Sequence, residues 1–203
     1  MKKFFTIIPG RKSSDLKVSR YTAVDNQKLQ MEHGTRFPIT AAMEGYLQEG
    51  DEFAIVAVLR NVDLYLENLE LFKKEVEAVC QLRGARCVDF RTVWIDAGQE
   101  VGVQLDIFQK LIDCVNDGDE LYSSMTYGTK PQSRALMMAV QYAYRIKKNC
   151  TIECILYGEF IWGSEVARIY DMTALIQMDE IVRMLADRGV TDPKATIKGI
   201  LSL

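Results

Sequence analysis

Short apolar runs alternate with segments of helical period along this chain. The runs that we interpret as strands are residues 4–8, 53–59, 87–95, 120–125, 151–156 and 166–170. A strand that is buried on both faces of a parallel sheet reads as such a run, because neither of its faces meets water. The pattern therefore predicts an α/β fold, with a Rossmann-like and mostly parallel sheet that is flanked by helices.

The segments between these runs carry apolar side chains at spacings of three and four. They predict helices at residues 36–47, 62–82, 101–115, 131–147 and 174–188. Asp192 and Pro193 are typical of a helix cap and first turn, so they predict one more helix. Residues 11–35 are polar and show no sustained period, and we expect a long loop or a β-hairpin excursion there.

The order of these elements suggests two parts. We expect residues 1–172 to form the α/β domain and residues 173–203 to form a C-terminal helical extension. The extension ends in the apolar residues Ile200, Leu201 and Leu203. We expect this end either to dock on the core or to connect to a following domain that has been removed.

The charge balance and the lengths of the apolar runs exclude several classes of partner. The 203 residues include 25 basic and 28 acidic side chains, which gives a formal charge of -3. A protein with this charge balance would displace few counterions from the DNA phosphates, so duplex DNA is not an expected partner. No apolar run approaches the roughly 20 residues that span a bilayer, and we expect a soluble protein without a membrane segment.

Histidine and cysteine usage narrows the chemistry further. The single histidine, His33, excludes a multi-histidine zinc site and is expected to be a solvated loop residue. The five cysteines contain no CxxC pair and lie among apolar residues, so we expect buried thiols in a cytoplasmic protein. Trp162 is expected to cover the core rather than to stack on a base. A divalent metal would have to use scattered aspartates, namely Asp89, Asp96, Asp113, Asp117 and Asp119.

Two polar loops are the strongest candidates for a ligand site. In open parallel sheets, ligands bind beyond the carboxyl ends of the strands, so the loops after the first and fourth predicted strands come first. Pro9–Asp15 offers a tight turn, two cations and hydroxyls, and Ser123–Arg134 brings hydroxyls, Gly128 and Lys130 to a helix N-terminus. These features favour an anion site, although the same residue types also serve as ordinary caps and turns. Neither a Walker A loop nor a GxGxxG motif occurs, which argues against ordinary ATP or NAD binding, and we expect no cofactor.

Five segments together resemble the CRISPR-associated Rossmann-fold (CARF) family. They are Met1–Phe4, Tyr21–Asp25, Thr35–Pro38, Met125–Pro131 and Ile169–Thr173. The similarity extends over essentially the whole chain, and its most specific element is the sequence TYGTKP at residues 126–131.

The resemblance implies that residues 1–172 are a ligand-sensing domain that forms a homodimer. The implied ligand is a cyclic oligoadenylate, the second messenger of type III CRISPR antiviral defence. A ring of identical adenylates can share the two-fold axis of a dimer, which favours cyclic tetra-adenylate over cyclic hexa-adenylate. The implied ligand-binding residues are Gly10, Arg11, Ser13, Ser14, Thr126, Tyr127, Gly128, Thr129 and Lys130.

Some members of this family also cleave the ring without a metal, using a ribose 2'-hydroxyl as the nucleophile. The candidate catalytic residues are then Lys130, which would stabilise the developing charge, and Ser13 or Ser14, which would orient the ribose. Three functions stay open on the sequence. They are a sensor that relays binding to an effector domain, a stand-alone ring nuclease, and an unrelated α/β protein that binds a nucleotide or sugar phosphate.

Overall fold

The computed structural model describes residues 1–160 and 166–202, and within them it confirms the α/β fold class. The strands are β1 (Lys2–Ile7), β2 (Tyr21–Ala23), β3 (Glu52–Leu59), β4 (Arg86–Trp94), β5 (Glu120–Ser124), β6 (Thr151–Phe160) and β7 (Ala167–Asp171). The α-helices are α1 (Ile39–Tyr46), α2 (Asp63–Arg83), α3 (Val101–Ile112), α4 (Lys130–Ile146), α5 (Thr173–Asp187) and α6 (Pro193–Leu201).

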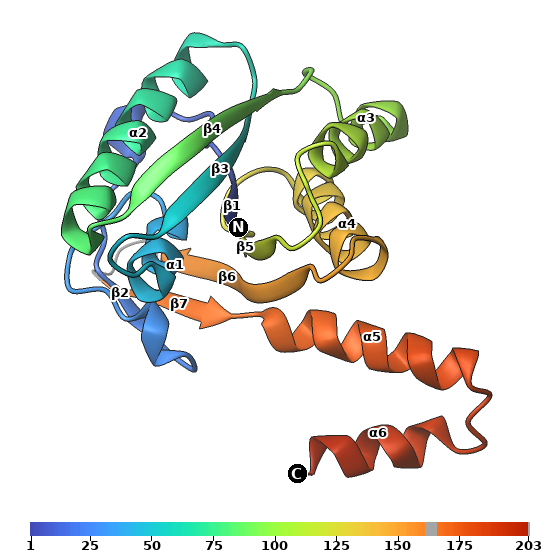
Figure 1. Cartoon of the computed structure of the whole chain (residues 1–203). Helices are drawn as coiled ribbons and strands as arrows, with labels where there is room; N and C mark the ends of the chain where they lie inside the picture. The colour runs from blue at the N-terminus through green and yellow to red at the C-terminus, as the bar shows by residue number, and fades with distance from the viewer. Residues whose placement is uncertain (161–165, 203) are drawn as a thin grey trace.

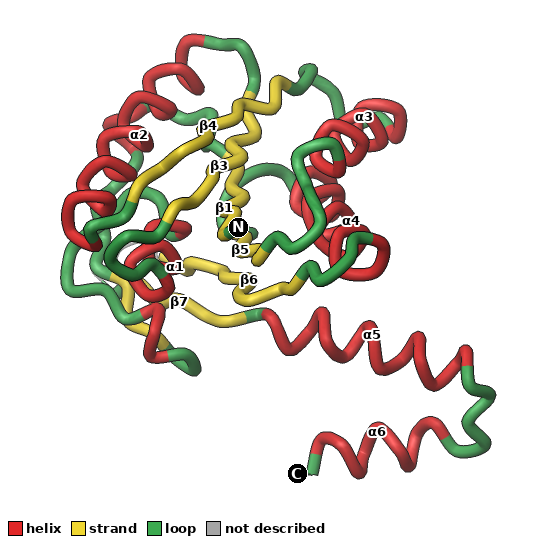
Figure 2. The backbone as a smooth tube through the Cα atoms, in the orientation of Figure 1, coloured by secondary structure: helices red, strands yellow, loops and turns green. Residues whose placement is uncertain are grey.

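The strands form one sheet in the order β2-β7-β6-β5-β1-β3-β4 (Figures 1 and 2). Neighbouring strands run parallel except β6 and β7, which are antiparallel. The central part, β4-β3-β1-β5-β6, has the strand order of a doubly wound Rossmann sheet. The sheet is therefore Rossmann-like and mostly parallel.

Helices cover both faces of this sheet. Helices α1 and α2 lie over one face and α3 and α4 over the other (Figure 1). Phe4 packs in the core under α1 and α2, whereas its neighbour Phe5 packs in the core under α3 and α4. Successive side chains of a strand point to opposite faces, so a strand between two helical layers must be apolar at both positions. This is why β3 is an apolar run from Phe53 to Leu59 in the sequence.

The segment at residues 11–35 differs from the prediction of a loop or a hairpin. It contains β2, which adds to the edge of the sheet parallel to β7, and two short 3-10 turns, Ser13–Asp15 and Gln27–Leu29. Strand β2 has only three residues, with Tyr21 and Ala23 buried and Thr22 exposed. Such a short alternation gives no detectable period in the sequence.

Helix α1 begins at Ile39, three residues later than the sequence pattern suggested. The Thr35 hydroxyl accepts a hydrogen bond from the Phe37 N–H at 2.8 Å and donates its proton to the Glu75 carboxylate of α2. These side-chain bonds hold the backbone in a turn that competes with a helix.

Helices α5 and α6 extend away from the sheet (Figure 1), and neither contains a buried residue. The start of α5 is nevertheless fixed, because the Thr173 hydroxyl accepts from the Ile155 N–H of β6 at 2.8 Å. Asp171 in turn accepts from the Asn26 side chain at 2.6 Å. The apolar residues Ile200 and Leu201 are exposed, so the described part of α6 does not dock on the core. No helix in residues 1–160 or 166–202 is long and apolar enough to cross a membrane.

A buried ion pair ties β1 to the turn before β5 at the amino ends of the strands. The Lys3 ammonium lies 2.8 Å from an Asp119 carboxylate oxygen and donates to the Cys114 carbonyl at 2.7 Å. Lys3 and Asp119 are only 3% and 2% exposed. Two charges at this depth are tolerated because each satisfies the other, and removing one leaves an uncompensated charge in the interior.

Replacing Asp119 with alanine is therefore expected to lower the free energy of unfolding by about 3 to 5 kcal/mol. Urea denaturation followed by circular dichroism measures this. The matched control is Arg86→Ala, which removes an exposed ion pair with Glu52 and should cost less than about 1 kcal/mol. Equal losses of unfolding free energy in the two variants would show that the buried Lys3–Asp119 pair contributes no more to stability than an exposed pair.

Candidate ligand-binding site

The central position of β1 creates a crevice at the carboxyl edge of the sheet. Strand β1 pairs with β3 on one side and β5 on the other. The chain leaves β3 for α2 on one face and leaves β5 for α4 on the opposite face (Figure 1). Such a point of divergence is where open α/β sheets bind their ligands. The loops after β1 and β5 both end there.

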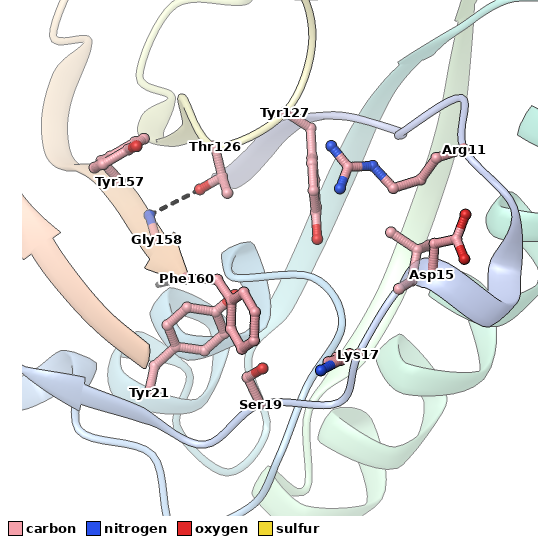
Figure 3. A pocket seen from close by; sticks show the side chains of 11 residues that line it. Arg11, Asp15, Lys17, Ser19, Tyr21, Thr126, Tyr127, Tyr157, Gly158 and Phe160 are labelled. Carbon is pink, nitrogen blue, oxygen red and sulfur yellow. Dashed lines mark hydrogen bonds between the residues drawn. The ribbon is translucent and has the colours of Figure 1, made fainter. Parts of the chain in front are cut away.

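A first cavity of about 220 Å³ opens at this point (Figure 3). Its charged lining residues are Arg11, Asp15 and Lys17, all from the segment after β1. Its aromatic lining residues are Tyr21, Tyr127, Tyr157 and Phe160. The cavity thus combines cations with aromatic surfaces, and the Arg11 guanidinium points toward Tyr127 (Figure 3).

Tyr127 is held in place by a hydrogen bond outside its own loop. Its hydroxyl donates to the Arg36 carbonyl at 2.6 Å. Burial raises the pKa of Tyr127 to about 12, with Glu75 adding to the rise and Arg11 opposing it. The Tyr127 phenol is therefore a neutral hydrogen-bond donor at physiological pH, and it serves to fix the loop.

Thr126 connects the same loop to β6. Its hydroxyl oxygen accepts from the Gly158 N–H at 2.9 Å, the bond drawn in Figure 3, and from the Ser124 hydroxyl at 3.1 Å. Position 158 is itself tightly packed, since a Cβ atom there would lie 2.6 Å from the Pro38 side chain. The loop after β5 is thus anchored on both sides before its glycine.

A second cavity of about 780 Å³ lies between the start of α4 and α5. Gly128, Lys130, Ser133 and Arg134 contribute to its polar side, and methionine, leucine and isoleucine side chains line the rest. Tyr157 lines both cavities, so the two adjoin across this side chain.

Gly128 is required at the turn between the cavities. Its φ is +96°, a region that L side chains rarely adopt, and an added Cβ would lie 2.6 Å from Ile7. The backbone of this loop therefore lies directly against the end of β1.

Within residues 1–160 and 166–202, four cations that line the two cavities have no carboxylate partner. Arg11 and Lys17 in the first cavity, and Lys130 and Arg134 in the second, form no ion pair with any residue in the described ranges. Asp179, the acidic residue of the second cavity, is already paired with Arg145 at 2.8 Å. Unpaired cations around adjoining cavities favour an anionic ligand with more than one charged group.

Several backbone amides at the start of α4 are occupied within the helix end itself. The Thr129 N–H donates to the Gln132 side chain at 2.9 Å, and the Gln132 N–H donates to the Thr129 hydroxyl at 3.4 Å. Pro131 has no N–H, and the Ser133 N–H bonds the Thr129 carbonyl at 3.0 Å. This capping box stabilises the start of the helix.

The structure brings together some of the sequence-predicted residues and separates others. Arg11, Thr126 and Tyr127 line the first cavity, and Gly128 and Lys130 line the second. The remaining candidates border neither cavity, namely Gly10, Ser13, Ser14 and Thr129. Lys130 therefore does not share a cavity with either serine.

Several lining residues were missed in the sequence, among them Tyr21, Tyr157 and Phe160. The aromatic pair on β6 follows the apolar run at residues 151–156, so it lies at the same sheet edge as the β5 loop. That position was the available signal, but the predicted strand ended four residues before the observed one. Trp162, the other aromatic residue considered, lies outside the described residues.

The aspartates, the histidine and the cysteines considered in the sequence do not form a further site within the described residues. Within the described residues, no three histidine, cysteine, aspartate or glutamate side chains converge as a metal site would require. His33 is exposed and lies 4.0 Å from Glu44. The five cysteines are free, three of them buried and Cys80 and Cys87 half-buried.

No protein-family model matches the chain, and no curated protein matches it.

Replacing Tyr127 with phenylalanine tests the anchor of the β5 loop. Because the pKa of Tyr127 is raised from 10.0 to about 12 in the folded protein, stability that is present below pH 10 is lost as the pH rises toward 12. At pH 7 the free energy of unfolding of Tyr127→Phe should be about 1 kcal/mol below that of the wild type, because the hydrogen bond to Arg36 is removed. Between pH 9 and 11 the free energy of unfolding should then fall less in the variant than in the wild type. Urea denaturation across this range measures both effects. Parallel pH profiles for the two proteins would contradict the buried, hydrogen-bonded phenol.

Proposed function

We propose that this chain is the sensor of a cyclic oligoadenylate in type III CRISPR antiviral defence, in a cytoplasmic homodimer that binds cyclic tetra-adenylate. The observation that carries the proposal is the set of unpaired cations around two adjoining cavities at the sheet edge. The resemblance of the chain to the CARF family supports the identity of the ligand.

The two cavities suit the two chemical parts of an oligoadenylate. Arg11 and Lys17 can bind phosphate in the first cavity, and Lys130 and Arg134 can do so in the second. Tyr157 is 41% exposed and lies between the two, where an adenine base could stack on it. Each protomer thus offers two cationic sites separated by an aromatic side chain.

A two-fold dimer would repeat this arrangement around a ring. An isologous pair presents the same residues twice, so each protomer would bind half of a four-membered ring. The second cavity is open and largely apolar, which suits a position next to a partner. A six-membered ring would need three adenylates per protomer, one more than the paired cationic sites supply.

Sensing is favoured over ring cleavage by the separation of the candidate catalytic residues. Lys130 lines the second cavity, whereas Ser13 and Ser14 line neither. Cleavage by a ribose 2'-hydroxyl needs in-line geometry and charge stabilisation at one phosphate. Binding of an intact ring, followed by relay through the α5–α6 extension to an effector, accounts better for this arrangement.

Titration of the purified protein with cyclic tetra-adenylate and cyclic hexa-adenylate tests the proposal. Arg11→Ala and Lys130→Ala should each weaken binding of cyclic tetra-adenylate by roughly tenfold or more, because each removes a charge-assisted contact. Lys74→Ala is the matched control, since Lys74 is an exposed lysine on α2 outside both cavities, and its affinity should equal that of the wild type.

Chromatography of the same mixtures without added metal separates the two functions. The sensor proposal predicts that the ring is recovered intact. Linear products that disappear in Lys130→Ala would identify a ring nuclease instead. Failure of the wild type to bind either ring would refute both and leave a different phosphate-bearing ligand.

A further inference from the structure

A buried asparagine of α2 holds the loop that follows β1. Asn68 is 0% exposed, although it lies in the middle of a helix whose other buried side chains are apolar. Its side-chain amide nitrogen donates to the Pro9 carbonyl at 2.7 Å and to the Arg11 carbonyl at 2.8 Å. One side chain thus binds the backbone on both sides of Gly10.

Asn68 holds the loop at a cost in stability, because its amide oxygen is left without a partner among the described residues. Both of its partners are carbonyl oxygens, so the amide nitrogen must face the loop and the amide oxygen must face away. That oxygen is buried and has no hydrogen-bond partner among the described residues. An unpaired buried acceptor destabilises the folded state, so the two hydrogen bonds that the amide nitrogen donates have to offset that cost. The arrangement makes sense if the position of the loop matters more than the penalty.

The two hydrogen bonds also set the direction of the loop amides. A trans peptide is planar with its C=O and N–H pointing in opposite directions, and the chain has no cis peptide bond in the described residues. The Pro9 and Arg11 carbonyls point at α2, so the N–H groups of Gly10 and Lys12 point away from it. Neither N–H donates a hydrogen bond to a described residue.

The loop also lies tightly on α2. A Cβ atom on Gly10 would lie 2.2 Å from the Tyr65 ring, so only glycine allows this approach. Tyr65 and Asn68 are one turn apart on the same helix and contact the same peptide segment.

We infer that Asn68 is a positioning residue for a phosphate site at the β1 loop. It turns the Gly10 and Lys12 amides outward as donors to phosphate and fixes the backbone from which the Arg11 side chain enters the first cavity. The inference rests on the proposed function for the identity of the ligand, but the amide donors require only an anionic phosphate group. Gly10, which lines neither cavity, thereby gains a role through its backbone.

The test combines a variant with a measurement on the wild type. Asn68→Leu keeps the branching of the side chain and the net charge but removes both donors, and it should bind cyclic tetra-adenylate at least tenfold more weakly. The Lys74→Ala control, on the same helix, should bind cyclic tetra-adenylate with the affinity of the wild type. In the wild type, NMR titration with inorganic phosphate should shift the Gly10 and Lys12 amide protons. These shifts should be absent in Asn68→Leu while the amide spectrum of the sheet stays unchanged.

The outcomes separate this inference from the proposed function. Unchanged affinity in a folded Asn68→Leu, or immobile Gly10 and Lys12 signals in the wild type with phosphate, would overturn the positioning role. If the wild type binds phosphate at these amides, Asn68→Leu does not, and the wild type binds no cyclic oligoadenylate, the proposed function fails and the role of Asn68 stands. If Asn68→Leu does not fold, Asn68→Ala, which also removes both donors, replaces it in the two measurements.

Discussion

The position of β1 between β3 and β5 is the constraint on which the candidate site depends. The chain must cross to opposite faces of the sheet after β3 and β5, so no helix can close over the carboxyl end of β1. The loops that end there keep polar groups in contact with solvent. Strand β1 is held in this position by apolar side chains on both faces and by the buried Lys3–Asp119 pair at its other end. The buried ion pair and the candidate site therefore lie at opposite ends of the same strand.

The two loops are shaped by elements far away in the sequence. The β1 loop is held by Asn68 and Tyr65 of α2, and the β5 loop by Arg36 and Gly158. Such cross-links leave each loop with few alternative conformations, so little entropy is lost when an anion binds. They also join the site to β6, whose Ile155 contacts the start of α5 through Thr173. A change at the cavities thus has a short covalent and hydrogen-bonded route to the C-terminal helices.

The sequence predicted the layers of this fold better than the walls of the site. Apolar runs such as 53–59 identify strands because burial on both faces excludes polar residues, and the three- and four-residue spacing in α2 gave bounds within one residue of those observed. Strand β2 and the start of α1 were missed because a three-residue strand and a threonine-stabilised turn leave no periodic signal. The loops at the sheet edge were identified from their glycines, hydroxyls and cations. The capping box at Thr129 and the role of Asn68 depend on partners that only the folded chain brings into contact.

The most direct measurement is the stoichiometry of cyclic tetra-adenylate binding to the purified protein by isothermal titration calorimetry, with sedimentation of the same sample. The account predicts saturation at one ring per two chains, with the dimer as the binding species and the ring intact at the end. Saturation at one ring per chain on a monomer, or no binding while the protein is folded, would contradict it.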